Sequence, residues 1–262
     1  MNQILKSAAL GDVVFIDQLT VSTPGLIGQT SGFLTHSRYH HATLFLDHFS
    51  DCPYIVMQKG LTGEETVRAK ARYEGHARRH GVKVKHYHTD NGIFRGEMFI
   101  EDVRVQRQTM SHCGVGAHHQ NGQVEKLIRD TQDHGRTVLL HAQQRWPDAV
   151  CENLWPYAFA LYVEIRKWTP RSIDGKIPYH LFCSSGEEKP NLKHLHTFGC
   201  PAFVLNKVLQ NDTSKLSKLS NRSKMGVYLG PSPNHASSVH MILSLQTGHV
   251  SPQFHAYFDD MF

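Results

Sequence analysis

Three short apolar runs open the pattern of hydrophobic and polar positions, and each predicts a β-strand. They cover residues 13–17, 42–49 and 53–59 and are rich in β-branched and aromatic side chains. Only a few residues separate the second run from the third, so these two should pair as a hairpin. The first part of the sequence therefore predicts a sheet.

A helix and a further strand are predicted next. Thr62 followed three residues later by Glu65 is a capping-box signature, which predicts a helix that begins there and ends near His80. Gly81 provides the stop signal for this helix. Residues 82–88 then alternate apolar and polar side chains and predict a strand.

Helices dominate the following part of the pattern. Residues 95–106 predict a short helix, and residues 106–112 a weakly patterned strand. Apolar side chains recur every three or four residues across 124–145, which predicts a long amphipathic helix. Another helix is expected over 153–168, with Asn153 as its N-cap. This order of strands and helices predicts a mixed α/β layer in which helices cover a sheet.

The pattern changes after residue 170, where short strands separated by Gly, Pro and Asn replace the helices. Such strands are predicted at 198–205, 225–230, 239–245 and 249–258. We therefore expect an α/β domain over 1–170, a loop-like linker over 171–196 and a small all-β module over 197–262.

Composition excludes several classes of protein. The 262 residues are 40% hydrophobic and 19% charged, which argues against a disordered or collagen-like chain. The 5 cysteines are scattered without a C-x-x-C pair, as expected for reduced thiols in the cytosol or nucleus. The first residues lack a secretory signal, and no apolar run is long enough to span a bilayer, so we expect a soluble intracellular protein without a membrane partner. The 20 histidines are an excess that none of these classes explains.

Positive charge gathers in two stretches. Residues 68–86 carry a local net charge of +6, and residues 215–224 carry +4 with no acid, whereas the whole chain has +5. Two basic patches on an otherwise acidic background favour a polyanionic partner such as nucleic acid. A solvated helix face and a charged loop would explain the same charges equally well.

Three carboxylates stand out by their positions. Asp17 lies in the first apolar strand, Asp90 follows the fourth strand, and Glu125 lies in the first turns of the long helix. Carboxylates at two strand ends and on a nearby helix are what a two-metal phosphodiester site needs, because their oxygens hold hard divalent cations. Each acid alone would also fit an ordinary surface or capping carboxylate. Asp47, on the second strand, is expected to be structural.

Several motifs make the sequence recognisable. HTDNG at 88–92 and GVGAHHQNGQVEK at 114–126 are followed by FGCPAFV at 198–204, MGVYLG at 225–230 and a closing FDDMF. Together they resemble the integrases of copia-type long-terminal-repeat retrotransposons, from about Gly11 to Phe262. The resemblance implies a ribonuclease H-like mixed sheet flanked by helices, followed by a small all-β, SH3-like C-terminal module.

The same resemblance implies a polynucleotidyl transferase. Asp17, Asp90 and Glu125 match the three acids that bind divalent metal in this family, so Mg²⁺ or Mn²⁺ is the expected cofactor. Such an enzyme trims the 3′ ends of element DNA by water attack and then joins the freed 3′-hydroxyls to target DNA. We therefore expect the element ends and the target DNA as partners, a homo-oligomer when active, and a nuclear location, or a cytoplasmic particle.

Further residues are candidates for contacts with DNA. Lys126 and Arg129 lie on the polar side of the long helix near Glu125, where they could contact phosphates, although ordinary solvent exposure explains them equally well. Asn121 suits a helix N-cap as well as it suits a DNA contact. The remaining candidates are Asn91 of the HTDNG motif and the four cations Lys215, Lys218, Arg222 and Lys224 of the second basic stretch.

Two departures from the family pattern keep alternatives open. The interval between Asp90 and Glu125 is 34 residues, one fewer than is usual among integrases. The family's His/His/Cys/Cys zinc module has no match, since no cysteine pair follows the H-x₃-H spacing of His36 and His40. A catalytically inactive remnant that only binds nucleic acid is therefore the main alternative. A ribonuclease H acting on RNA–DNA hybrids would share the site but explains the β module poorly.

Overall fold

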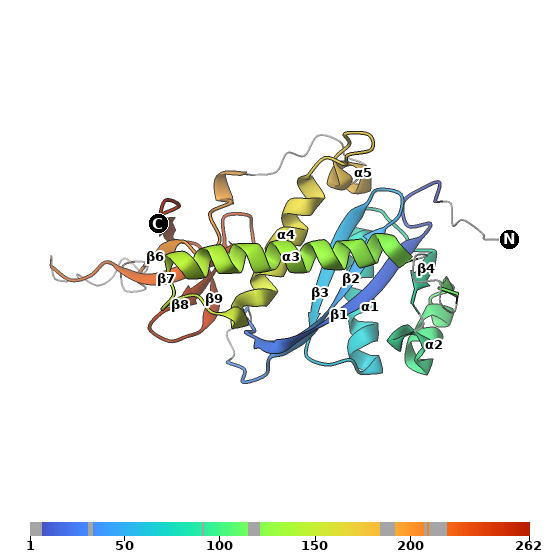
Figure 1. Ribbon diagram of the computed structural model, residues 1–262, viewed down its shortest axis with the longest axis horizontal. Coiled ribbons are helices and arrows are strands. Elements are labelled where there is room, and N and C mark those ends of the chain that lie inside the picture. Colours follow the sequence, from blue (N-terminus) through green and yellow to red (C-terminus); the bar gives the residue numbers. More distant parts are fainter. Residues whose placement is uncertain are drawn as a thin grey trace. The chain divides into compact units, whose positions relative to one another are not determined.

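The computed structural model describes residues 7–30, 34–90, 92–114, 121–183, 192–206, 209 and 219–262 (Figure 1). The chain packs into two compact units whose segments interleave along the sequence. Unit 1 comprises Met1–Pro24, Tyr39–Asp133 and Tyr162–Pro190, and unit 2 comprises Gly25–Arg38, His134–Leu161 and Asn191–Phe262. The sequence-based division at residues 170 and 197 stays a prediction, because these units are assembled from non-contiguous segments.

Unit 1 contains a five-stranded mixed sheet with the order β3-β2-β1-β4-β5. Its strands are β1 (Val14–Gly25), β2 (Tyr39–Asp47), β3 (Cys52–Gln58), β4 (His86–Thr89) and β5 (Thr109–His112). The predicted hairpin is confirmed, since β2 and β3 pair antiparallel. Strand β4 runs parallel to both β1 and β5. Strands β4 and β5 end together, at Thr89 and His112, level with Ile16 of β1, which continues to Gly25.

The helices of unit 1 follow local signals. Helix α1 spans Gly63–Arg79, and the Thr62 hydroxyl accepts a hydrogen bond from the Glu65 backbone N–H at 3.3 Å, which confirms the predicted cap. Gly81 lies in the left-handed region with φ +74°, a conformation that other residues adopt at a cost. After a short 3₁₀ turn (η1, Ile93–Arg95), helix α2 spans Glu97–Val105. Helices α3 (Gly122–Arg145) and α4 (Trp155–Trp168), each divided between the two units, complete the predicted order.

Two predicted boundaries differ from the structure. The alternating run 82–88 forms a strand only from His86, where pairing with Thr109 of β5 begins; pairing with β1 starts one residue later, at Tyr87. Asn153 lies inside a 3₁₀ turn (η3, Glu152–Leu154) and does not cap α4. Its side-chain oxygen instead accepts a hydrogen bond from the Cys151 thiol at 2.8 Å, and its backbone oxygen accepts one from the Leu26 N–H at 2.8 Å.

The expectation that 171–196 is wholly an irregular linker is wrong for part of it. Residues Pro178–Cys183 form helix α5, and a further 3₁₀ turn (η4) covers Leu192–His194. The Phe182 ring is 1% exposed and stacks on the His76 ring of α1, with centroids 5.8 Å apart. Burial of this ring in the core of unit 1 stabilises a helix too short to form by its own propensity.

The core of unit 1 fills the space between the sheet and its helices. Its members are buried apolar side chains that come mainly from β1 to β4, α1, α2 and α5, among them Ile16, Phe45, Tyr73, Tyr87 and Phe99. The rings of Phe45 and Tyr73 stack with centroids 4.6 Å apart, which joins α1 to the sheet. This packing fixes the position at which β4 ends beside β1.

Unit 2 contains a five-stranded antiparallel sheet with the order β10-β6-β7-β8-β9. The strands are β6 (Pro201–Leu205), β7 (Ser223–Pro231), β8 (His240–Ser244), β9 (Val250–Gln253) and β10 (Ala256–Phe258). The last predicted run therefore splits into two strands that pair with different neighbours. Val227, Leu229 and Leu243 pack with Leu154 and Leu161 in the core of this unit.

Two composition-based expectations can be compared with the structure. All five cysteines are free thiols, and only Cys151 is exposed. Within the described part of the chain, no helix is long and apolar enough to cross a membrane.

Candidate active site

Asp17, Asp90 and Glu125 all belong to unit 1. Asp17 lies on β1, and Asp90 directly follows β4. Ile16 of β1 pairs with Thr89 of β4, and the strands are parallel. Asp17 and Asp90, the residues that follow this pair, therefore occupy neighbouring positions. Glu125 lies in the first turn of α3. The Asn121 amide, just before this helix, donates a hydrogen bond to the Ile16 backbone oxygen at 3.4 Å, which places the helix start beside β1.

The three carboxylates interact electrostatically. Burial is the main reason why the pKa of Asp17 rises to about 7, and the negative charges of Asp90 and Glu125 raise it further. A hydrogen bond from the Gln18 backbone N–H to Asp17 Oδ1, 2.7 Å long, acts in the opposite direction. The shorter interval between Asp90 and Glu125 therefore does not take Glu125 out of electrostatic range of Asp17.

Cys113 lies beside the same three acids and was missed by the sequence reasoning. Burial raises the pKa of its thiol, and the charges of Asp90, Glu125 and Asp17 raise it further. Cys113 follows β5 as Asp90 follows β4, so the end of the weakly patterned strand was the signal that could have identified it. Its sulfur lies 3.6 Å from His88 Nε2 on the neighbouring strand.

The carboxylates of this region differ in the hydrogen bonds that they accept. Asp90 Oδ1 accepts a hydrogen bond from the Gly92 backbone N–H at 3.1 Å. Asp47, by contrast, is fully buried and accepts hydrogen bonds from the Gly11 N–H at 2.8 Å and from the Ser50 N–H and hydroxyl at 2.9 and 2.7 Å. These bonds fit the structural role expected of Asp47.

The three carboxylates are suitable ligands for a hard cation, but they are not placed close enough together to coordinate one. Among the residues that the structure describes, no three carboxylate, imidazole or thiol groups are placed so that they could hold one metal ion. What the arrangement provides is a concentration of negative charge at one edge of the sheet. Such a concentration attracts divalent cations.

The predicted DNA-contacting residues are in different environments. Lys126 and Arg129 are exposed on α3, and Lys126 pairs with Asp130 at 3.1 Å. Asn121 is fully buried, so in this conformation its side chain is not available to DNA. Arg222 and Lys224 are exposed, before and at the start of β7. Asn91, Lys215 and Lys218 lie outside the described residues.

The first basic stretch, residues 68–86, presents less unpaired positive charge than its sequence suggests. Lys70 is buried and pairs with Glu74 at 2.9 Å and with Asp102 at 2.6 Å. Arg68 pairs with acids of its own helix, and Lys85 pairs with Asp12 at 2.7 Å. Four exposed cations of this stretch have no ion-pair partner among the described residues, namely Arg72, Arg78, Arg79 and Lys83.

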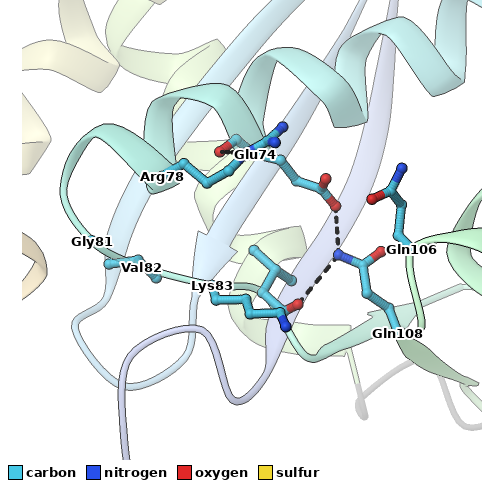
Figure 2. Close-up of a pocket in the computed structure, with 8 residues that line it drawn as sticks. Glu74, Arg78, Gly81, Val82, Lys83, Gln106 and Gln108 are labelled. Carbon is cyan, nitrogen blue, oxygen red and sulfur yellow. Dashed lines mark hydrogen bonds between the residues drawn. The ribbon is translucent and has the colours of Figure 1, made fainter.

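A hollow of about 290 Å³ lies beside these cations (Figure 2). Arg78 and Lys83 are among its lining residues, and inside it the Gln108 amide donates hydrogen bonds to Glu74 at 2.6 Å and to the Val84 backbone oxygen at 3.2 Å. The residues before β4 and β5 form its wall, whereas Asp90 and Cys113 follow these strands. The hollow is therefore at the opposite edge of the sheet from the acids.

The sequence was compared with protein families and with curated proteins. No family model matches it. It is 27% identical over 237 residues to the Retrovirus-related Pol polyprotein from transposon RE1 of Arabidopsis thaliana, a match that covers 88% of this chain and 15% of that protein. The chain thus spans about 15% of the length of this curated relative.

The fold was also compared with solved structures. A chain of the simian T-cell lymphotropic virus intasome, solved in complex with PP2A regulatory subunit B56 gamma, has a TM-score of 0.51 and 16% identity over 97% of this chain and 81% of its own. The HTLV-2 integrase catalytic core domain in complex with magnesium has a TM-score of 0.47 and 17% identity over 68% of this chain and 99% of its own.

The mixed α/β sheet of unit 1 agrees with the expected ribonuclease H-like integrase core. The SH3-like character of the C-terminal module is not confirmed by these comparisons. The chain is related over most of its length to part of a retrovirus-related Pol polyprotein of a copia-type transposon, and the integrase resemblance predicted from its motifs is confirmed.

Proposed function

We propose that this chain is a retrotransposon integrase that processes the 3′ ends of element DNA and transfers them to target DNA. One observation carries the proposal: the parallel pairing of Ile16 with Thr89 brings Asp17 and Asp90 to neighbouring positions, and the hydrogen bond from Asn121 to the Ile16 oxygen holds the start of α3, which carries Glu125, beside them. The charges of Asp90 and Glu125 contribute, after burial, to the raised pKa of Asp17, which agrees with this placement.

The acids suit Mg²⁺ or Mn²⁺ by their chemistry. Carboxylate oxygens are the preferred ligands of such hard cations. Asp17 is partly buried, and burial together with the charges of Asp90 and Glu125 raises the pKa of its carboxyl, so a neighbouring cation would favour its ionised form. When bound, the metal would activate the attacking oxygen and stabilise the leaving oxygen. Asp17, Asp90 and Glu125 would hold it, which requires these carboxylates to draw closer together than they are placed here.

The chain's own residues prepare this site. Gln18 and Gly92 each donate a backbone N–H to Oδ1 of an aspartate, which orients the Asp17 and Asp90 carboxylates. Lys126 and Arg129 follow Glu125 within about one helical turn, so they would contact the phosphates on either side of the reacting bond.

The remaining parts of the proposal concern partners. The antiparallel module that contains Arg222 and Lys224 would bind DNA as an SH3-like domain, together with Lys215 and Lys218, and Asn91 would contact DNA beside Asp90. An active homo-oligomer and a nuclear site of action follow from the need to join two element ends to a chromosome. A size measurement with and without DNA, and localisation of a tagged chain, test these two points.

A strand-transfer assay tests the activity. Labelled duplexes that carry element ends are incubated with target DNA and Mg²⁺ or Mn²⁺, using the wild type, Asp90→Asn and Glu125→Gln. We expect shortened 3′ ends and joined products with the wild type, and at least a hundredfold less with either variant. Glu101→Gln is the matched surface control, because it makes the same change from carboxylate to amide at an exposed residue of α2.

Two results would contradict the proposal. DNA binding by the wild type without product above the Asp90→Asn background would support the inactive remnant that only binds nucleic acid. Cleavage of an RNA–DNA hybrid but not of DNA would support a ribonuclease H.

A further inference from the structure

The backbone carbonyl of Asp90 accepts two side-chain hydrogen bonds from neighbouring residues. The Thr89 hydroxyl donates to it at 2.8 Å, and His112 Nδ1 lies 3.1 Å from it. Thr89 and His112 face each other across the parallel ladder between β4 and β5. His112 Nδ1 also lies 2.8 Å from the Thr89 hydroxyl oxygen, so the three groups form one closed cluster.

Only one arrangement of protons satisfies this cluster. A carbonyl oxygen can accept but not donate, so His112 Nδ1 must carry a proton to bond with Asp90. The Thr89 hydroxyl gives its single proton to the same carbonyl and therefore accepts from His112 Nδ1. A neutral imidazole with its proton on Nδ1 meets both requirements, so the cluster needs no charge on His112.

These contacts restrain Asp90 from the side opposite its carboxylate. On one face of the sheet, His88 Nδ1 lies 2.8 Å from the Ser111 hydroxyl, and this face also carries Cys113. Side chains alternate along strands, so Thr89 and His112 occupy the other face. His112 thus reaches the main chain of Asp90, while the Gly92 N–H holds its Oδ1.

We infer that His112 is a positioning residue that fixes the orientation of the Asp90 carboxylate toward the divalent cation, an inference that rests on the proposed function. Asp90 follows a strand of only four residues, and the ladder ends with the bond from the Cys113 N–H to the Thr89 oxygen. The two side-chain bonds therefore add restraint where the ladder stops. Groups that orient metal ligands typically change metal affinity about 10- to 100-fold when removed.

Three variants test this role. His112→Leu removes the donor, whereas His112→Asn keeps an N–H close to the position of Nδ1. His86→Leu is the matched control, because His86 is the first residue of β4, beside β5, and bonds the Thr109 and Ser111 hydroxyls, at 2.8 and 2.7 Å, rather than the Asp90 backbone. Mn²⁺ affinity is measured by electron paramagnetic resonance, and the Mg²⁺ dependence of strand transfer is measured alongside.

We expect about tenfold weaker Mn²⁺ binding for His112→Leu, and affinity within about twofold of wild type for His112→Asn and His86→Leu. The Mg²⁺ concentration for half-maximal activity should rise in parallel. If His112→Leu does not fold, Thr89→Val removes the second donor with the same shape, and an equal loss of affinity is expected.

Wild-type Mn²⁺ affinity in a folded His112→Leu variant, or an equal loss in His112→Asn and His112→Leu, would overturn the inference. A wild type that binds Mn²⁺ but transfers no strand would refute the proposed activity while leaving the comparison of affinities intact. A wild type that binds no Mn²⁺ at all would overturn both.

Discussion

Replacing Asp17 with asparagine should stabilise the protein while abolishing the proposed activity. The Asp17 carboxyl has a pKa of about 7, against an ordinary 3.8, mainly because it is buried. Below pH 3.8 the carboxyl is protonated in both the folded and the unfolded chain, and the shift costs no stability. As pH rises from about 4 to 7, only the unfolded chain ionises, so the wild type loses stability progressively.

The magnitude follows from the difference of about three pH units between the two states. At 1.36 kcal/mol for each unit this is at most about 4 kcal/mol above pH 7. Because the carboxyl keeps some contact with solvent, we expect about 2 to 4 kcal/mol. Asparagine carries no charge at any pH, and its Oδ1 can still accept the hydrogen bond from the Gln18 N–H.

Urea denaturation without divalent metal, followed by circular dichroism, measures this difference. The advantage of Asp17→Asn over the wild type should be largest at about pH 8 and should shrink toward zero near pH 4. Asp47→Asn is the matched control with the opposite sign, since Asp47 accepts three hydrogen bonds and its replacement should destabilise. An Asp17→Asn variant no more stable than wild type at the higher pH, or an advantage independent of pH, would refute the reasoning.

Three further predictions concern the rest of unit 1. Lys70→Ala should cost about 3 to 5 kcal/mol of unfolding free energy, because it leaves Glu74 and Asp102 without their buried cation; a much smaller loss in urea denaturation would contradict this. Burial and nearby cations lower the pKa of His76 to about 3, so stability should fall as pH drops from 6.5 toward that value, and His76→Phe should reduce this slope in melts at about pH 7 and pH 5. Phe182→Ala should cost about 3 to 5 kcal/mol and expose α5 to proteolysis, whereas unchanged protection would show that its ring does not hold α5.

Local sequence determined much of the secondary structure. The capping pair Thr62 and Glu65, the hairpin of β2 and β3 and the period of α3 were all predictable, because each depends on residues a few positions apart. The HTDNG and QNG motifs likewise identified Asp90 and Glu125 as candidates, because each motif is contained in a few consecutive residues. These signals survive in the fold because local and tertiary preferences agree there.

Tertiary structure alone decided how these parts meet. The pairing of β1 with β4 brings Asp17 to the edge where Asp90 lies, and no local pattern contains that pairing. The same holds for Cys113, which the ladder between β4 and β5 places beside the acids. The charge that the first basic stretch presents is also lower than its sequence indicates, since Lys70 is neutralised by an acid 32 residues away. A sequence specifies which residues can ionise, but burial and long-range neighbours determine their effective charge, because both depend on contacts that exist only in the folded chain.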